Sequence, residues 1–242
     1  MEYAQARMQA RFGERPGAAL WRELDSVRDL GAYLDSLQGT PLRGWVAGID
    51  ASGDLHHIEL RLRERFRSHI HEVARWMPGV WSPAVRGIAQ LLDLPARAHL
   101  YSGHRPLSWM MQEPGLRALA ADAGEGRLAI AGFARAESRE DRAAWLAEWE
   151  RRWPVGDGES RLAMTSIIAT LSRHLERFRL APARDGWCLR AELEQNLRVL
   201  FRRLALQPEA CFAYLGLVAL DLERLRAQLV RRALWLRERV AP

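Results

Sequence analysis

The chain has 242 residues, of which 48% are hydrophobic and 27% are charged. This composition is that of a globular protein with its own core, and it excludes a disordered chain, a collagen and a coiled-coil rod. The formal net charge is +6, and all 36 basic residues are arginine. Because the 30 acidic residues are interleaved with the arginines, we interpret most charges as solvated, ion-paired helix faces.

The elements predicted near the N-terminus are short helices. Apolar residues with helical spacing extend from Trp21 to Leu37. Thr40 then precedes Pro41, which places a capping hydroxyl before a proline suited to a first helical turn. A long helix follows, because apolar residues recur there in steps of three and four: Leu55, Ile58, Leu62, Phe66, Ile70, Val73 and Met77.

Prolines divide the middle of the chain into further short helices. Ser82-Pro83 repeats the pattern of a capping hydroxyl before a proline. Gly126 to Phe133 is ambiguous between a short helix and a loop, and another helix is predicted over Arg142 to Trp153. Other helix boundaries are predicted at Pro95, Pro114 and Pro208.

Three longer helices are predicted in the C-terminal third. Their apolar faces are Leu162, Ile168, Leu171, Leu175 and Phe178; Leu193, Leu197, Leu200, Phe201 and Leu204; and Leu215, Val218, Leu222, Leu225, Leu229 and Leu236. Since no run of β-branched residues alternates convincingly, the predicted fold is an all-α, multi-helix bundle without a substantial sheet. Gly156-Asp157-Gly158 marks a linker between an N-terminal helical part, residues 1–154, and a C-terminal bundle, residues 159–242, which we expect to pack as one domain.

A short motif occurs twice. Glu59-x-x-Leu62-Arg63-x-x-Phe66 recurs as Glu194-x-x-Leu197-Arg198-x-x-Phe201. The first copy is followed by Leu92-Asp93-Leu94 and Arg97-Ala98-His99-Leu100, and the second by Leu220-Asp221-Leu222 and Arg226-Ala227-Gln228-Leu229. Because Leu, Arg and Ala are abundant, chance and duplication explain this echo equally well. Duplication implies repeated antiparallel helical units that bury a shared face.

The cysteines and the N-terminus indicate a cellular compartment. Cys188 and Cys211 lie in apolar stretches, as expected of buried free thiols in a reducing cytoplasm. Met1-Glu2-Tyr3 begins no signal sequence, and no run of 18 apolar residues exists. We therefore expect a cytoplasmic protein without a membrane span.

Candidate catalytic and metal-binding residues are sparse. His56, His57 and Glu59 lie together, but only His56 and Glu59 have a spacing that places both on one helix face. No HExxH, GxSxG or Gly-rich phosphate loop is present. We expect no catalytic residue, no metal and no cofactor, and we keep as an alternative an enzyme with a metal site built from His56, His57 and Glu59.

Ten tryptophans are a large number for this length. Trp145, Trp149 and Trp153 form a stripe with a spacing of four residues, beside Arg151 and Arg152. Such a stripe belongs either to the core between helices or to a partner-binding face, where Trp and Arg are enriched. The residues that we single out as possible partner contacts are Trp145, Trp149, Trp153, Arg151, Arg152, Arg226, Arg231 and Arg232.

The C-terminal helix carries a resemblance to a known family. Phe212-Ala213-Tyr214-Leu215, then Ala219-Leu220-Asp221-Leu222-Glu223-Arg224-Leu225-Arg226 and Arg231-Arg232, resemble a stretch of the V-type ATPase subunit that caps the membrane rotor. This subunit is called C in the prokaryotic V/A-type enzymes and d in the vacuolar enzyme. Looser matches are Tyr3-Ala4-x-Ala6-Arg7, Asp29-Leu30-x-x-Tyr33-Leu34 with Thr40-Pro41, Ile58-Glu59 and the Asp93-Leu94 segment.

The resemblance implies a mechanical function. Members of this family form a funnel of helices that sits on the ring of proteolipids and receives the foot of the central stalk. The chain is then expected to be a non-catalytic rotor adaptor, peripheral to the inner face of the cell membrane, that transmits torque for proton or sodium transport. Its partners are expected to be the proteolipid ring and central-stalk subunits.

Two departures from the family pattern are visible. Typical members are longer than this chain. The asparagine of the family's D-x-x-N turns is missing from both copies, since Pro95 follows the first Asp-Leu and Glu223 follows the second. The chain therefore resembles a divergent and shortened member of the family.

A second alternative belongs to another functional class. The sequence pI of about 10.2 is compatible with a helical protein that binds nucleic acid. The chain has no helix-turn-helix signature and no localised basic arm. We expect no nucleic-acid partner and keep this reading as an alternative.

Overall fold

The computed structural model describes residues 1–124, 137–155 and 158–240. Over these residues every regular element is a helix and no strand occurs, so the predicted all-α multi-helix bundle is confirmed. The ambiguous segment Gly126 to Phe133 and the linker residues Gly156 and Asp157 lie outside the described residues. None of the helices in the described part has both the length and the apolar composition of a membrane span.

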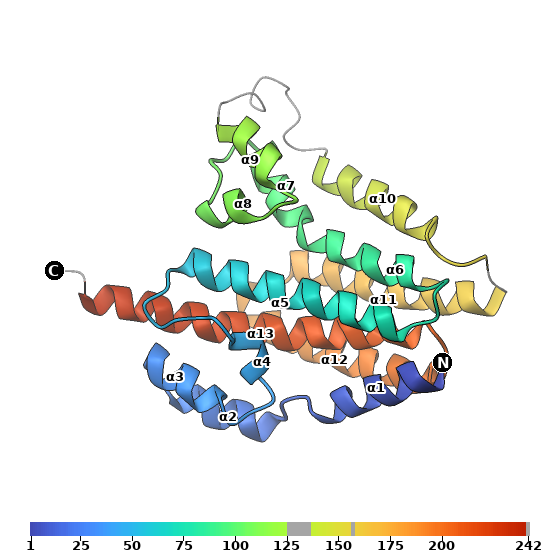
Figure 1. Cartoon of the computed structure of the whole chain (residues 1–242), viewed down its shortest axis with the longest axis horizontal. Coiled ribbons are helices and arrows are strands. Elements are labelled where there is room, and N and C mark those ends of the chain that lie inside the picture. Colours follow the sequence, from blue (N-terminus) through green and yellow to red (C-terminus); the bar gives the residue numbers. More distant parts are fainter. Residues whose placement is uncertain (125–136, 156–157, 241–242) are drawn as a thin grey trace.

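Short helices occupy the N-terminus and long helices form the body (Figure 1). The N-terminal helices are α1 (Glu2–Gly13), α2 (Ala18–Ser26), α3 (Leu30–Leu37) and α4 (Arg43–Val46). The long helices are α5 (Leu55–Trp76), α11 (Gly158–Leu180), α12 (Gly186–Arg203) and α13 (Ala210–Val240). Between α5 and α11 lie α6 (Ser82–Gly87), the 3-10 helix η1 (Ile88–Leu92), α7 (Leu94–Tyr101), α8 (Ser108–Gln112), α9 (Arg117–Gly124) and α10 (Glu137–Glu150).

Side-chain caps begin two of these helices. Asp54 accepts a hydrogen bond from the backbone N–H of His57 and so caps α5, and Asp29 caps α3 in the same way through Ala32. Ser82, which the sequence suggests as a cap, is instead the first residue of α6 and makes no capping bond. Capping therefore fixes the start of α5, the helix that carries Glu59, Arg63 and Arg67.

The predicted apolar faces of α5, α12 and α13 are buried in the structure. On α5, for example, Ile58, Ile70 and Val73 are fully buried, and α13 buries Leu225 and Leu229 completely. These faces are buried because the long helices pack against one another, α12 with α13 and α13 with α5. The side chain of Leu236, predicted on the α13 face, lies outside the described ones.

The predicted apolar face of α11 is partly wrong. Leu162 is 72% exposed and Leu175 is 42% exposed, whereas Ile168 and Leu171 pack against the main core as expected. The residues that α11 buries most deeply are Ala163, Met164 and Ile167. Apolar residues occur on several sides of α11, so its periodicity alone does not select one face.

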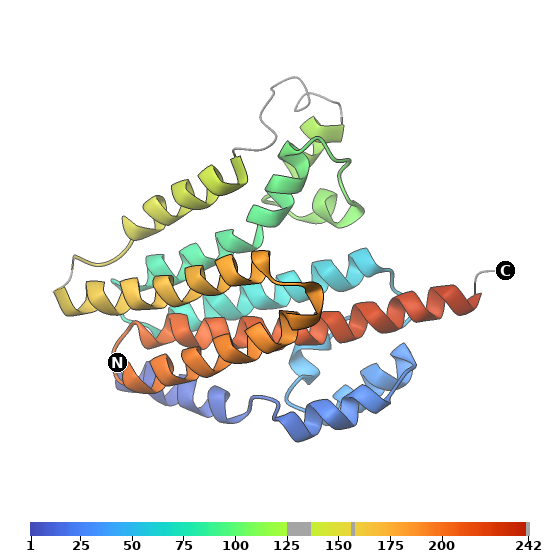
Figure 2. The same cartoon turned by 180° about the vertical axis from the view of Figure 1, so that it is seen from behind.

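One hydrophobic core joins the two predicted parts of the chain. Figures 1 and 2 show α13 running through the middle of the body, with α5 and α12 beside it and α1 to α3 along one side. Residues from both parts, such as Tyr33, Ile70, Ile167 and Leu225, belong to the same buried cluster. The segments 1–154 and 159–242 therefore share a core.

A small lobe stands on top of this body. It consists of α7, α8 and α9, and it is seen above α5 in Figure 1. Its own core contains Leu100, Trp109, Met110 and Leu116 together with Leu60 of α5. Because this cluster is separate from the main core, the attachment of the lobe depends strongly on its other contacts with α5.

Candidate partner-binding site

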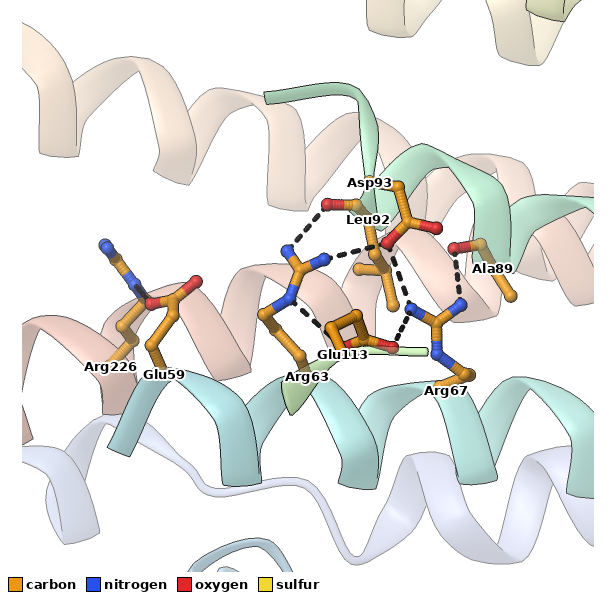
Figure 3. A network of polar contacts seen from close by, with 8 residues as sticks. All are labelled: Glu59, Arg63, Arg67, Ala89, Leu92, Asp93, Glu113 and Arg226. Atoms are coloured by element: carbon orange, nitrogen blue, oxygen red, sulfur yellow. Dashed lines mark hydrogen bonds and ion pairs between the residues drawn. The ribbon is translucent and has the colours of Figure 1, made fainter. Parts of the chain in front are cut away.

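The polar residues of the sequence echo lie in ion pairs that connect helices. In the first copy, Arg63 of α5 donates from Nη2 to Oδ1 of Asp93 over 2.9 Å and from Nη1 to the carbonyl of Leu92 over 2.6 Å (Figure 3). Arg63 and Asp93 are both buried. The pair therefore fastens the start of α7 to the middle of α5.

A second arginine and a second carboxylate complete this network. Arg67 donates from Nη2 to Asp93 over 3.1 Å and to Glu113 over 3.0 Å, and Glu113 is buried at the end of α8. The guanidinium of Arg63 also lies 4.3 Å from the centre of the Trp109 ring. Burial lowers the pKa of Arg63, and the carboxylates of Asp93 and Glu113 offset part of this effect. We call these residues the lobe network, since they hold the lobe to α5.

The second copy of the echo lies in another buried network. Arg15, in the connection between α1 and α2, donates to Asp221 of α13 from Nε over 2.6 Å and from Nη2 over 2.9 Å. Its Nη2 also donates to Glu194 of α12 over 3.2 Å, and Glu194 accepts from Arg198 over 2.7 Å. Burial raises the pKa of Asp221, and Arg15 offsets this only in part. This central network joins three parts of the bundle.

Both copies of the echo form a similar unit. Each is an antiparallel pair, α5 with the α6–α7 segment and α12 with α13 (Figures 1 and 2). In the first pair, Arg63 binds Asp93 directly. In the second pair, Arg198 binds Glu194, and Arg15 connects Glu194 to Asp221. The repeated motif therefore contains the residues that form the two networks. That these residues link different helices was not predicted from the sequence.

A cross-link also connects the two copies. Glu59 of α5 accepts a hydrogen bond of 2.6 Å from Nε of Arg226 on α13 (Figure 3). Arg226, a predicted partner contact, is thus engaged within the chain, although its side chain remains partly exposed. The pair lies beside the lobe network and links α5 to the central helix.

The predicted tryptophan stripe belongs mainly to the core. Trp149 is 4% exposed, and its Nε1–H donates to the carbonyl of Ala84 over 2.6 Å. Its ring stacks on Trp145 and meets Trp153 edge-on, so the stripe attaches α10 to α6. The approach is close, because a Cβ on Gly87 would lie 2.8 Å from the Trp149 ring. Trp149 is therefore not available to a partner, and the core reading is the observed one.

The predicted arginines divide into buried and exposed residues. Arg232 is 2% exposed and donates to the carbonyls of Leu24 and Val27 at the end of α2, so it is a core residue and not a partner contact. Arg151 is exposed and pairs with Glu148, and Arg152 pairs weakly with the same carboxylate. Arg231 is 59% exposed and keeps its guanidinium at the surface.

Arg231 borders a groove of about 580 Å³ between α2, α12 and α13. We call it the arginine groove. Its lining carries four arginines and three carboxylates together with apolar side chains: Arg190, Arg198, Arg224 and Arg231; Asp25, Glu194 and Asp221; and Trp21, Trp187, Ala191, Leu220 and Ala227. Only Arg231 was singled out from the sequence. The missed signal is the matching spacing of Trp187, Arg190 and Arg198 on α12, which places them on one helix face.

The alternative metal site has no assembled ligand set. Glu59 is bound by Arg226, and His57 contacts the carbonyl of Gly48 through Nε2 at 2.9 Å. Among the described side chains, no group of three or more His, Cys, Asp or Glu residues could hold a metal ion. His56 lines an apolar groove under the lobe instead. Both cysteines are free, and Cys211 is buried as expected, whereas Cys188 is exposed, so its predicted burial is wrong.

A buried histidine lies in a second cavity, of about 400 Å³, between α1, α4, α5 and α13. His69 makes a 3.0 Å hydrogen bond through Nε2 with the hydroxyl of Tyr214, and its Nδ1 lies 3.4 Å from the Glu72 carboxylate. Trp45 meets the imidazole edge-on. Burial lowers the pKa of His69, Glu72 opposes this change, and Arg11 adds to it.

This environment predicts a pH-dependent stability. As pH falls below the ordinary histidine pKa of 6.5, the unfolded chain binds a proton at His69 before the folded chain does, so the free energy of unfolding decreases. Above pH 6.5, the contribution of neutral His69 to the free energy of unfolding is fully present. Denaturant titrations above and below pH 6.5 should show that the difference in the free energy of unfolding between wild type and His69→Gln becomes smaller in acid. Parallel pH profiles for the two proteins would contradict this assignment, since His71 and His174 titrate equally in both.

No protein-family model, no curated protein and no solved structure matches the chain. Its function is therefore inferred from the molecule itself. Two features are available for this inference: helices cross-linked by buried ion pairs, and an arginine-lined groove at the surface.

Proposed function

We propose that the protein is a non-catalytic central-rotor adaptor of a V-type ATPase. In this proposal it links the membrane proteolipid ring to the central stalk and transmits torque for proton or sodium transport. It lies in the cytoplasm, at the inner face of the cell membrane, and is held there by its protein partners. The chain itself breaks no bond.

The observation that carries the proposal is the spatial grouping of the segments that resemble the family. The strongest of them, residues 212–226, forms the first half of α13. Of the looser matches, those on α1, α3 and α5 lie on helices that pack against α13, whereas Asp93-Leu94 lies at the start of α7 in the lobe. Segments far apart in the sequence therefore meet around one helix, as expected if they derive from one ancestral architecture.

The polar cross-links support a mechanical function. A piece that transmits torque must resist sliding of its helices, and apolar contacts alone are not directional. Charge-assisted hydrogen bonds are directional, and the bidentate contact of Arg15 with Asp221 fixes the positions of two elements relative to each other. Arg63 and Arg226 supply comparable links on the other side of α13. The bundle is thus cross-linked on both sides of its central helix.

The proposal is tested by coupling in membrane vesicles. We expect vesicles from cells without the chain to lose ATP-driven ion uptake while the catalytic head keeps hydrolysing ATP, because the head is no longer connected to the ring. Uptake should return when the wild-type chain is supplied. Unchanged ion uptake in the absence of the chain would contradict the proposal.

A further inference from the structure

We propose that the arginine groove binds an acidic helical segment of a partner protein. The inference rests on the proposed adaptor role only in that an adaptor needs a partner. It adds the place of contact and the chemistry of the partner. The groove lies between α12 and α13, away from the lobe that Figure 1 shows above α5.

Arg224 and Arg231 of the groove keep N–H donors available for a partner. A guanidinium offers several N–H donors. Arg224 lies 3.8 Å from the Asp25 carboxylate and Arg231 lies 3.9 Å from it, both beyond hydrogen-bond distance. Arg231 does donate to the side chain of Gln228 over 2.8 Å. Both guanidinium groups can therefore accommodate carboxylates from outside without first losing a strong internal pair.

Aromatic rings hold two arginines of the groove, Arg190 and Arg224, in place. The guanidinium of Arg190 lies 4.9 Å from the centre of the Trp187 ring and 4.5 Å from that of Phe178. Arg224 lies 4.7 Å from the centre of the Trp21 ring. Stacking restricts the long side chains before binding, so less conformational entropy is lost when a partner arrives.

Exposed aromatic side chains lie on the same helices as the arginines of the groove. Trp187 and Trp235 are each 50% exposed. Arg224, Arg231 and Trp235 have the spacing of one face of α13, and the two arginines are separated by about 10 Å along the helix. Trp and Arg together are the residues most enriched at the energetic centres of protein interfaces. The length of this face fits about two turns of a partner helix.

Charge complementarity decides between an acidic protein segment and nucleic acid. Arg15 neutralises Asp221 and shares Glu194 with Arg198, and Arg190 lies 3.8 Å from the Glu223 carboxylate, so the open part of the groove presents mainly Arg224 and Arg231. Asp25 nevertheless stands between Arg224 and Arg231. A continuous polyanion would meet this carboxylate with repulsion, whereas a protein segment can place a neutral or basic residue opposite it. An acidic segment of mixed sequence is therefore the occupant that the groove fits.

The test uses a display library of random 16-residue peptides, selected on the immobilised full chain. We expect the enriched peptides to be rich in Asp and Glu and to lose at least tenfold in affinity for the double variant Arg224→Gln, Arg231→Gln. The matched control is Arg161→Gln, Arg173→Gln on the exposed side of α11, which removes the same charge and should change the affinity less than twofold. Circular dichroism melts of both variants verify that folding is retained.

Four outcomes would overturn the inference. The first three are a failure to enrich any peptide, enriched peptides without acidic residues, and equal loss of affinity in the two double variants. Tighter binding of a single-stranded oligonucleotide through Arg224 and Arg231 than of the best peptide would also overturn it, in favour of nucleic acid. Because the assay contains no other subunit of the proposed ATPase, its result is independent of the vesicle experiment, and either proposal can fail alone.

Discussion

Replacement of Arg15 by methionine is expected to lower the free energy of unfolding by about 3–5 kcal/mol, the cost of removing one partner from a buried ion pair. The Arg15 side chain is 6% exposed and is bound to Asp221 and Glu194. Its removal leaves two carboxylates close together in a poorly hydrated site. Chemical denaturation followed by helical circular dichroism measures the loss.

Acid provides an internal control for this result. Burial already raises the pKa of Asp221 from 3.8, and loss of the guanidinium raises it further. As pH falls towards that pKa, Asp221 becomes neutral in the variant, and the deficit relative to wild type should shrink. Arg184→Met, at an exposed arginine, should change stability by less than about 0.5 kcal/mol. A deficit for Arg15→Met as small as that control would show that the central network does not hold the bundle.

Replacement of Arg63 by methionine is expected to cost a similar amount, about 3–5 kcal/mol, because Asp93 and Glu113 then keep only Arg67 as a partner. The loss should be concentrated in the lobe. Hydrogen exchange measured by mass spectrometry should show amides of α7, α8 and α9 losing protection before those of α12 and α13.

The neighbouring arginine supplies the matched control for this prediction. Arg67→Met leaves Arg63 bound to Asp93, and Arg67 is the more exposed of the two arginines, so the variant should lose less stability than Arg63→Met. If hydrogen exchange increased uniformly over the whole chain in Arg63→Met, the lobe network would not be a local fastener. Equal losses of stability in Arg63→Met and Arg67→Met would contradict the expectation that Arg63 contributes more than Arg67.

The helices that the sequence predicted best are those with a single continuous apolar stripe. The faces of α5, α12 and α13 were correct, because burial on one side is set by local periodicity. The face of α11 was predicted only in part, since Leu162 and Ile167 point to different sides and local periodicity does not choose between them.

The candidate site was harder to predict because its contacts are remote in sequence. Arg15 meets Asp221 across 206 positions, and no spacing rule connects them. Arg231 and Arg232 illustrate a signal that was present but overlooked. They are neighbours on α13, roughly 100° apart around the helix, and Arg232 continues the buried stripe of Leu225 and Leu229. Helical phase therefore separates the buried arginine from the exposed one.

The association of this chain with a rotary complex is tested most directly by its native partners. The measurement is affinity purification of the tagged chain from mildly solubilised membranes of its own host, with every co-purifying protein identified by mass spectrometry. We predict that proteolipid and central-stalk subunits are recovered with it. Recovery of the chain as a lone monomer, from membranes and cytosol alike, would contradict the proposed function.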